Sequence, residues 1–198
     1  DHVVGLPLLL DSVGEQRQQP LIVHALPEVL AILSEHMFNW KLWPDFRVIP
    51  DEATPWLRFE ALPFGASVSL GTRKFHPMPA HHVVPACGVH IATPGGSFVF
   101  SGDTGHSPGL IHALNNMRDL CHLIIETSFE DALKDVAIAS RHHWPASLVA
   151  ELAQLTIKPQ VWITHLKPGN EAAIMQELQR SAPDWHLQAA WQGQQIEI

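Results

Sequence analysis

Histidine and aspartate residues stand in this sequence where they could bind metal ions. The chain starts with Asp1 and His2, and four later stretches place such a side chain directly after an apolar, strand-like run: AHHVVP (80–85), FSGDTG (100–105), ASRHHWP (139–145) and ITHLKP (163–168). Strand ends in α/β folds carry side chains from rigid elements to a shared site. Because imidazole and carboxylate together suit zinc, manganese or iron, these stretches predict a metal site.

Each stretch taken alone also fits a purely structural role. A single histidine after a strand is more often a hydrogen-bonded residue than a ligand, and Gly-Asp-Thr often forms a turn with an Asx hydrogen bond. Asp103 stands out because a carboxylate can bridge two ions and because Gly102 lets the backbone come close. The order and number of the stretches favour the metal site.

Alternating elements must position these side chains. Apolar patterning predicts helices at 2–10, 26–39, 108–119, 145–156 and 170–180, and strands at 21–25, 56–61, 67–76, 88–93, 97–103, 122–127, 160–165 and 185–197. Pro7 weakens the first of these helices. The first half is rich in strands and the second half alternates strand and helix, which predicts a layered α/β sandwich.

Length, charge and composition narrow the class of protein. A chain of 198 residues suits one domain, and no apolar run approaches the roughly 20 residues of a membrane helix. The net charge is −8 with only 12 Lys and Arg, which disfavours a long nucleic-acid interface. The 14 histidines outnumber Lys and Arg together, so we expect some of them to bind metal.

The sequence resembles the metallo-β-lactamase superfamily in the order DH, an isolated His before a strand, GDT and a late TH. In that family the metal site begins with an HxHxDH motif, which this chain would enter at its last two residues. Further segments resemble the class II cyclic-nucleotide phosphodiesterases: DHVVGLPLLLD (1–11), HMFNWKLWPDF (36–46), FSGDTG (100–105), IIETSF (124–129), HHWPASLVAEL (142–152) and ITHLKP (163–168). The resemblance runs from residue 1 to about residue 170.

The resemblance implies a four-layer αββα metallo-β-lactamase sandwich whose N-terminal strands are absent from this chain. Residues 1–198 would then be one hydrolase domain that is incomplete at its N-terminus, with two further ligands upstream. The implied metal ligands are Asp1, His2, His82, Asp103 and His165. His82 matches the isolated ligand better than its neighbour His81, because it stands three residues before Pro85.

Asp1 and His142 are the implied catalytic residues. His142 matches the histidine of the family's GHLTP-like segment, whose form here is RHHWP, with Arg141 in place of Gly. The choice between His142 and His143 stays open. Glu126 in IIETSF either orients a histidine of the site or caps the strand end.

The implied activity is hydrolysis of a 3′,5′-cyclic nucleotide, cAMP or cGMP, to a 5′-nucleotide. Two divalent ions, zinc or alternatively manganese, would activate a water between them and neutralise charge on phosphorus. The alternatives are RNA 3′-end processing of the RNase Z type, hydrolysis of another small ester, and a metal-poor scaffold module. With part of the site missing, residues 1–198 alone are expected to bind at most one tight metal ion and to hydrolyse cAMP feebly.

The expected partner is a small cyclic nucleotide, with no membrane or nucleic acid, and a homodimer is allowed. The expected location is the cytoplasm, with periplasmic export open because a leader would precede residue 1. Phe38, Trp40 and Trp43 are interpreted as core or dimer-contact residues, with base stacking as the alternative.

Overall fold

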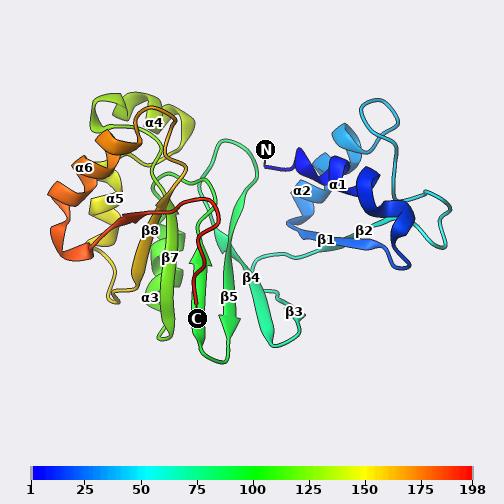
Figure 1. The fold of residues 1–198 in the computed structure, drawn as a ribbon, viewed down its shortest axis with the longest axis horizontal. Helices are drawn as coiled ribbons and strands as arrows, with labels where there is room; N and C mark the ends of the chain where they lie inside the picture. The colour runs from blue at the N-terminus through cyan, green and yellow to red at the C-terminus, as the bar shows by residue number, and fades with distance from the viewer. Residues whose placement is uncertain (1, 198) are drawn as a thin grey trace. The chain divides into compact units, whose positions relative to one another are not determined.

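The computed structural model describes residues 2–197, which divide into two compact units, one that ends at Pro63 and one that begins at Phe64 (Figure 1). The sequence-based expectation of a single domain therefore stays a prediction. None of the helices formed by residues 2–197 is both long and apolar enough to cross a membrane.

The first unit pairs two parallel strands with two short helices. Its elements are α1 (Gly5–Val13), β1 (Leu21–Ala25), α2 (Pro27–Ile32), which continues as a π-helical turn (Leu33–Met37), and β2 (Leu57–Ala61). Pro7 and Pro27 lie in the first turns of α1 and α2, where a missing backbone N–H breaks no helical hydrogen bond. The core of this unit consists of Leu10, Leu30, Leu33, Phe38, Phe46 and Leu57.

The second unit is built on a seven-stranded sheet in the order β3-β4-β5-β6-β7-β8-β9. Its strands are β3 (Val68–Leu70), β4 (Arg73–Pro79), β5 (Cys87–Thr93), β6 (Gly96–Phe100), β7 (Leu120–Glu126), β8 (Gln160–Thr164) and β9 (Gln188–Ala189). Its helices are α3 (Pro108–Asn115), α4 (Lys134–Ser140), α5 (Pro145–Leu152) and α6 (Glu171–Ser181).

The pairing of these strands determines where the functional loops meet. Strands β3 to β6 are antiparallel to their neighbours, whereas β6 to β9 run parallel, connected through helices. The carboxyl ends of β6, β7 and β8 therefore share one edge of the sheet, and the β4–β5 loop reaches the same edge (Figure 1). This edge is where polar side chains from distant parts of the sequence can converge.

One face of the sheet forms the core of the second unit with the helices. Alternate residues of β6, β7 and β8, which are Val99, Leu123, Ile125, Val161 and Ile163, are buried in one cluster with apolar residues of α3, α5 and α6. Burying a side chain of this kind contributes about 1.5–3 kcal/mol. The strands that carry the site are thus held rigidly.

The mixed α/β class predicted from the sequence is confirmed, and most differences lie at element ends. The segment 67–76 forms a hairpin, because Gly71 adopts a left-handed conformation (φ +61°) between β3 and β4. The helices predicted at 108–119 and 145–156 end at Asn115 and Leu152, and the strand predicted at 185–197 is reduced to β9. Helix α4 was not predicted.

Candidate metal centre

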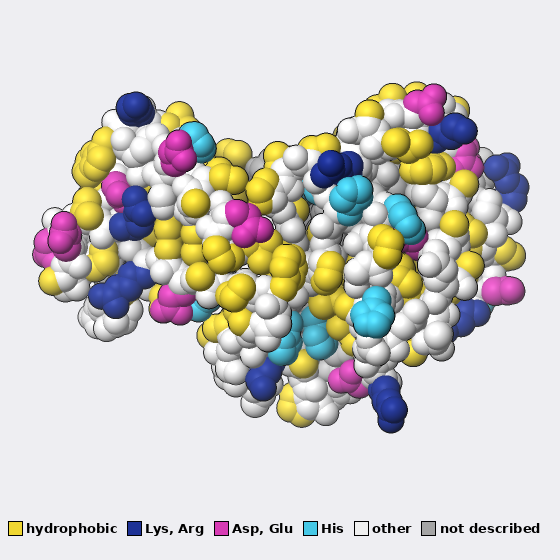
Figure 2. All heavy atoms as spheres, turned by 180° about the vertical axis from the view of Figure 1, so that it is seen from behind, with side chains coloured by type: hydrophobic (Ala, Val, Ile, Leu, Met, Phe, Trp, Pro, Cys, Tyr) yellow, Lys and Arg dark blue, Asp and Glu magenta, His cyan; other side chains and the backbone are white. Residues whose placement is uncertain are grey.

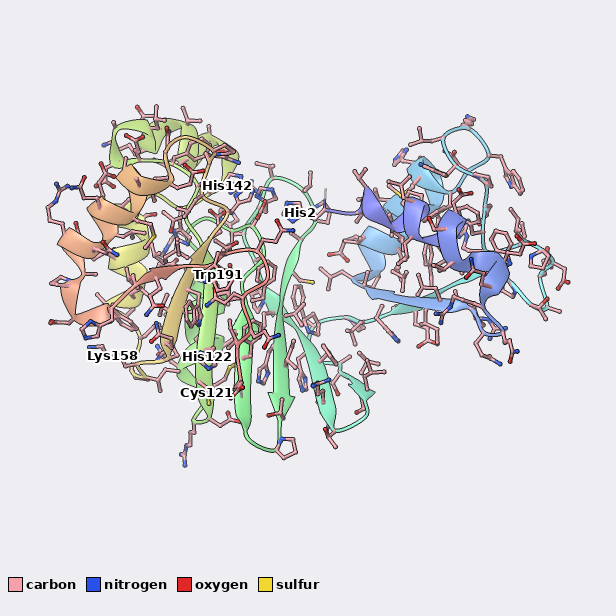
Figure 3. The ribbon with its side chains drawn as sticks, in the orientation of Figure 1. His2, Cys121, His122, His142, Lys158 and Trp191 are labelled. Atoms are coloured by element: carbon pink, nitrogen blue, oxygen red, sulfur yellow. The ribbon has the colours of Figure 1, made fainter. Side chains whose placement is uncertain are left out.

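Histidine and carboxylate side chains meet at the edge of the sheet where β6, β7 and β8 end. Two groups of possible ligand atoms occur in the second unit, and within each group the atoms lie within 4.8 Å of one another: His82, Asp103 and His142, and Glu126, His142 and His165. All of these residues are buried except His165, which is half-buried. Figure 3 shows His142 beyond the ends of the strands, and Figure 2 shows further histidines on the surface of the same unit.

Close backbone contacts hold the loops of the site together. Gly102 has φ +62°, and a Cβ on it would lie 3.0 Å from the carbonyl oxygen of Cys87. A Cβ on Gly105 would lie 3.1 Å from the carbonyl carbon of Arg141. The β4–β5 loop joins them, because the amide of His81 donates to Thr104 Oγ1 at 2.9 Å. The FSGDTG segment therefore needs its glycines for close packing.

Hydrogen bonds orient the imidazole of His165. The hydroxyl of Ser128 donates to Glu126 Oε2 at 2.9 Å, so its oxygen is available to accept from His165 Nδ1 at 2.6 Å. The proton of neutral His165 then sits on Nδ1, and the lone pair of Nε2 faces Asp103 Oδ2 at 3.4 Å. Burial lowers the pKa of the His165 imidazole below its usual value. The negative charge of Asp103 opposes this shift, and the positive charge of Lys167 adds to it.

The other two histidines follow the same rule. His142 Nδ1 lies 2.5 Å from Glu126 Oε1, to which it donates, and His82 Nδ1 lies 3.4 Å from the carbonyl oxygen of Arg141. In each case the Nδ1–H has an acceptor, so Nε2 carries the lone pair in the neutral form. Imidazoles that bind metal are oriented in this way, through a hydrogen bond from the ring nitrogen that does not bind the ion. The donor set therefore fits a divalent cation.

The carboxylate of Glu126, at the end of β7, connects the loop that follows β6 with the segment before α5. Its side chain is fully buried, and its oxygens also accept from the backbone amides of Thr104 at 2.9 Å and His143 at 3.3 Å. A buried carboxylate needs such partners to remain charged. Of the two interpretations left open by the sequence, the contact with His142 matches the orienting role, and the backbone contacts show that Glu126 also fixes the loops.

His143 points away from the cluster into the protein. It is fully buried, with Nδ1 2.9 Å from Ser147 Oγ and Nε2 3.3 Å from Glu151 Oε2. Burial alone would raise the pKa of Glu151, but the nearby imidazole of His143 and hydrogen bonds from the Ser107 amide and His106 hold it below the usual value. Neighbouring residues of the extended RHHWP segment thus face opposite sides, and His142 is the one at the site.

Arg141 occupies a backbone conformation that glycine adopts most easily. Its φ is +55°, at the position where the resembling GHLTP segment has Gly. The guanidinium donates to the carbonyl oxygen of His82 at 2.6 Å, while the Arg141 carbonyl faces His82 Nδ1. Arg141 therefore contacts His82 through both its side chain and its backbone, which compensates for the strained conformation.

The structure brings together four of the residues predicted from the sequence: His82, Asp103, His142 and His165. Asp1 lies outside the described residues. His2 belongs to the first unit, so its part in the site stays a prediction. 

The aromatic residues of the 36–46 segment have different roles. Phe38 is fully buried and Trp43 packs against the core of the first unit, as interpreted, whereas Trp40 is 64% exposed and is not a core residue. 

Sequence reasoning missed several groups around the histidines. Ser128 and Phe129 lie in the quoted IIETSF segment and Lys167 in ITHLKP, so the signal was present without a role attached. The contact between the Arg141 carbonyl and His82 could not be predicted, because every residue has a backbone carbonyl.

Comparisons with known proteins agree with this geometry. The family model described as "Beta-lactamase superfamily domain" matches residues 1–166. A Yersinia pestis protein named "Probable 3′,5′-cyclic-nucleotide phosphodiesterase" is 25% identical over 213 residues, which cover 91% of this chain and 60% of that protein. This chain thus spans less than two thirds of the curated relative.

Solved structures show the same fold. Unliganded yeast PDE1 matches 98% of this chain and 64% of its own, with a TM-score of 0.81 and 20% identity. The metallo-β-lactamase fold protein YhfI from Bacillus subtilis matches 98% of this chain and 71% of its own, with a TM-score of 0.75 and 12% identity. These likenesses confirm the metallo-β-lactamase fold expected from the sequence.

Proposed function

The chain belongs to the beta-lactamase superfamily, and we propose that it is a metal-dependent phosphodiesterase that opens 3′,5′-cyclic nucleotides to 5′-nucleotides. One observation carries this proposal. Three imidazoles donate their Nδ1–H groups to acceptors in the protein. Ligand atoms of His82 and His142 lie within 4.8 Å of the buried Asp103, whose Oδ2 lies 3.4 Å from His165 Nε2. The name of the Yersinia pestis relative supports the choice of substrate class.

We propose that Asp1, His2, His82, Asp103 and His165 would hold two metal ions, and that the carboxylate of Asp103 would be shared by both. Zinc is the proposed metal and manganese the alternative, since both accept imidazole and carboxylate ligands. Bound there, divalent cations supply Lewis-acid activation of water and neutralise charge on the phosphate. Asp1 is proposed to be a catalytic carboxylate as well as a ligand.

His142 is the proposed proton donor to the leaving oxygen. When water attacks phosphorus and the bond from phosphorus to O3′ breaks, the sugar oxygen needs a proton, which His142 Nε2 would give. The Glu126 carboxylate against Nδ1 stabilises the positive charge of the imidazolium before that transfer. Because Glu126 is fully buried and bonded to two loops, it keeps the ring in one orientation.

Metal analysis and a substrate panel on the full-length natural protein test this function. The panel compares cAMP, cGMP, bis-p-nitrophenyl phosphate, a lactam and a pre-tRNA, with the metal content measured by plasma mass spectrometry. We expect bound zinc or manganese and hydrolysis of a cyclic nucleotide to a 5′-nucleotide, while the lactam stays intact. The activity of the whole protein is part of the proposal, because this chain covers 60% of the curated relative.

Each rival function has its own outcome in the same panel. Cleavage of the pre-tRNA alone would replace the proposal with RNA 3′-end processing, and cleavage of other small esters alone would restrict it to ester hydrolysis. Absence of both metal and hydrolysis would favour a scaffold module.

A further inference from the structure

A lysine and a phenylalanine that take no part in the proposed chemistry lie beside the candidate metal centre. The ring of Phe129 packs edge-on against the imidazole of His142, with 5.9 Å between the ring centroids. Lys167 Nζ lies over the Phe129 ring, 5.6 Å from its centroid. Phe129 directly follows Ser128, and Lys167 comes two residues after His165, so both are fixed by the segments that orient the histidines.

The ammonium of Lys167 forms no ion pair with any residue that the structure describes. Among residues 2–197, no carboxylate lies within ion-pair distance of it, although Asp103 and Glu126 are both close to His165. Its contact with the phenyl ring leaves its three N–H donors free for oxygen acceptors. Both Lys167 and Phe129 are half-buried, which makes a new charged partner worth more there than on an open surface.

An anionic phosphate is a better partner for this ammonium than a phenyl ring. Charge-assisted hydrogen bonds to phosphate are stronger than contacts with a neutral group. The move of Lys167 to such an anion would also uncover the ring face of Phe129, beside the proposed proton donor. Aromatic faces stack on nucleobases or pack against sugars.

We propose that Lys167 and Phe129 form the substrate-binding rim of the metal centre: Lys167 binds a phosphate oxygen, and Phe129, uncovered by that movement, packs against the nucleoside. This inference rests on the proposed function and adds to it the residues that recognise the two ends of the nucleotide. It requires no covalent step.

Titration calorimetry with inorganic phosphate and 5′-AMP tests the rim on the full-length protein, with the metal it holds when purified. We expect Lys167→Met to weaken the binding of both probes about tenfold, the size of one charge-assisted hydrogen bond. We expect Phe129→Leu to weaken the binding of 5′-AMP severalfold without weakening the binding of phosphate, since Lys167 then has no aromatic contact to give up. Circular dichroism of each variant shows whether the fold is retained.

Lys158→Met is the matched control. Lys158 Nζ lies 5.7 Å from the ring of Trp185, the same type of contact, and Figure 3 shows Lys158 at the opposite end of the sheet from His142. This variant should bind both probes as the unsubstituted protein does.

The outcomes separate the rim from the function. If Lys167→Met binds phosphate as tightly as the unsubstituted protein, or if the unsubstituted protein binds neither probe, the rim does not exist. If binding depends on Lys167 but no cyclic nucleotide is hydrolysed in the substrate panel, the rim stands and the proposed function falls.

Discussion

Two pairs of stacked histidines in the second unit have almost the same ring geometry but very different surroundings. His142 and His165 lie 5.0 Å apart with 25° between their planes, and His76 and His90 lie 5.3 Å apart with 23° between theirs. In the first pair, both Nδ1 atoms contact acceptors, and two carboxylates lie close by. Stacked imidazoles by themselves therefore do not provide the donor arrangement of the candidate metal centre.

The pair His76 and His90 lies in surroundings that do not provide such acceptors. His76 and His90 are directly opposite each other on β4 and β5, away from the strand ends. His90 Nε2 is buried and finds no hydrogen-bond partner among residues 2–197. Loops at a strand end can bring carboxylates and carbonyls around a ring, whereas the middle of a sheet has its backbone groups already paired.

Removing the carboxylate of Asp103 should have the largest effect on metal content and activity, and so should separate the two histidine pairs most clearly. We expect Asp103→Asn to lose metal and to lower kcat/KM by more than about 100-fold, because the neutral amide cannot balance the cation. Metal per chain, measured by plasma mass spectrometry, and cyclic-nucleotide hydrolysis check it. The matched change at the other pair, His76→Gln, should keep the metal content; loss of metal in that variant would contradict the contrast.

Glu126→Gln should have the next largest effect. The amide keeps the volume but removes the charged acceptor of the His142 Nδ1–H, and loss of such partners typically costs 10–100-fold in activity or metal affinity. Steady-state kinetics measure the change. Glu60→Gln is the control, since the exposed Glu60 carboxylate lies 3.5 Å from the half-buried His24 ring in the first unit. Equal activity of the Glu126 variant and the unsubstituted protein would show that the carboxylate has no orienting role.

Ser128→Ala should have a smaller effect and weaken metal binding about tenfold, the lower end of the range of about 10–100-fold for loss of a ligand's hydrogen-bond partner. It removes the acceptor of the His165 Nδ1–H, but a water can take the place of a hydroxyl at a half-buried ring. Competition with a chelator measures the affinity. A variant with unchanged affinity would mean that the Ser128 hydroxyl does not orient His165.

The smallest expected effect concerns the pair His76 and His90. It is a change in the pH dependence of the free energy of unfolding. Burial lowers the pKa of His90, the charge of His76 adds to this, and Asp119 opposes it. Unfolding restores a value near 6.5, so as pH falls through that value the unfolded state binds the proton more readily and the folded state loses stability. In His90→Phe this loss should shrink.

Urea unfolding of both proteins at pH 7.5 and pH 5.5 measures this difference. An equal loss of unfolding free energy in the two proteins would exclude His90 as a source of acid sensitivity.

Much of the second unit could be predicted from its sequence because its strands are short apolar runs that end at polar residues. Helix α4 was missed for a physical reason. Its Val136 and Ile138 are 49% and 57% exposed and only Ala137 is buried, so no apolar stripe marks an inward face. The strand predicted at 185–197 failed because only Gln188 and Ala189 pair with β8.

The sequence by itself determined the chemical class of the site. Asp103 and His165 follow β6 and β8, whose parallel pairing with β7 brings their ends to one edge, and residue type alone makes them candidates for a metal. Strand ends are visible in a sequence because hydrophobic runs stop there.

Only the tertiary structure decided which histidine of RHHWP faces the site and where each imidazole proton lies. The ring of His143 is buried between Ser147 and Glu151 of α5, whereas His142 contacts Glu126. These choices depend on hydrogen bonds between segments far apart in the sequence, including a backbone carbonyl of Arg141 that has no residue-type signature. A linear pattern records which groups are available, whereas three-dimensional packing selects the partner that each nitrogen finds.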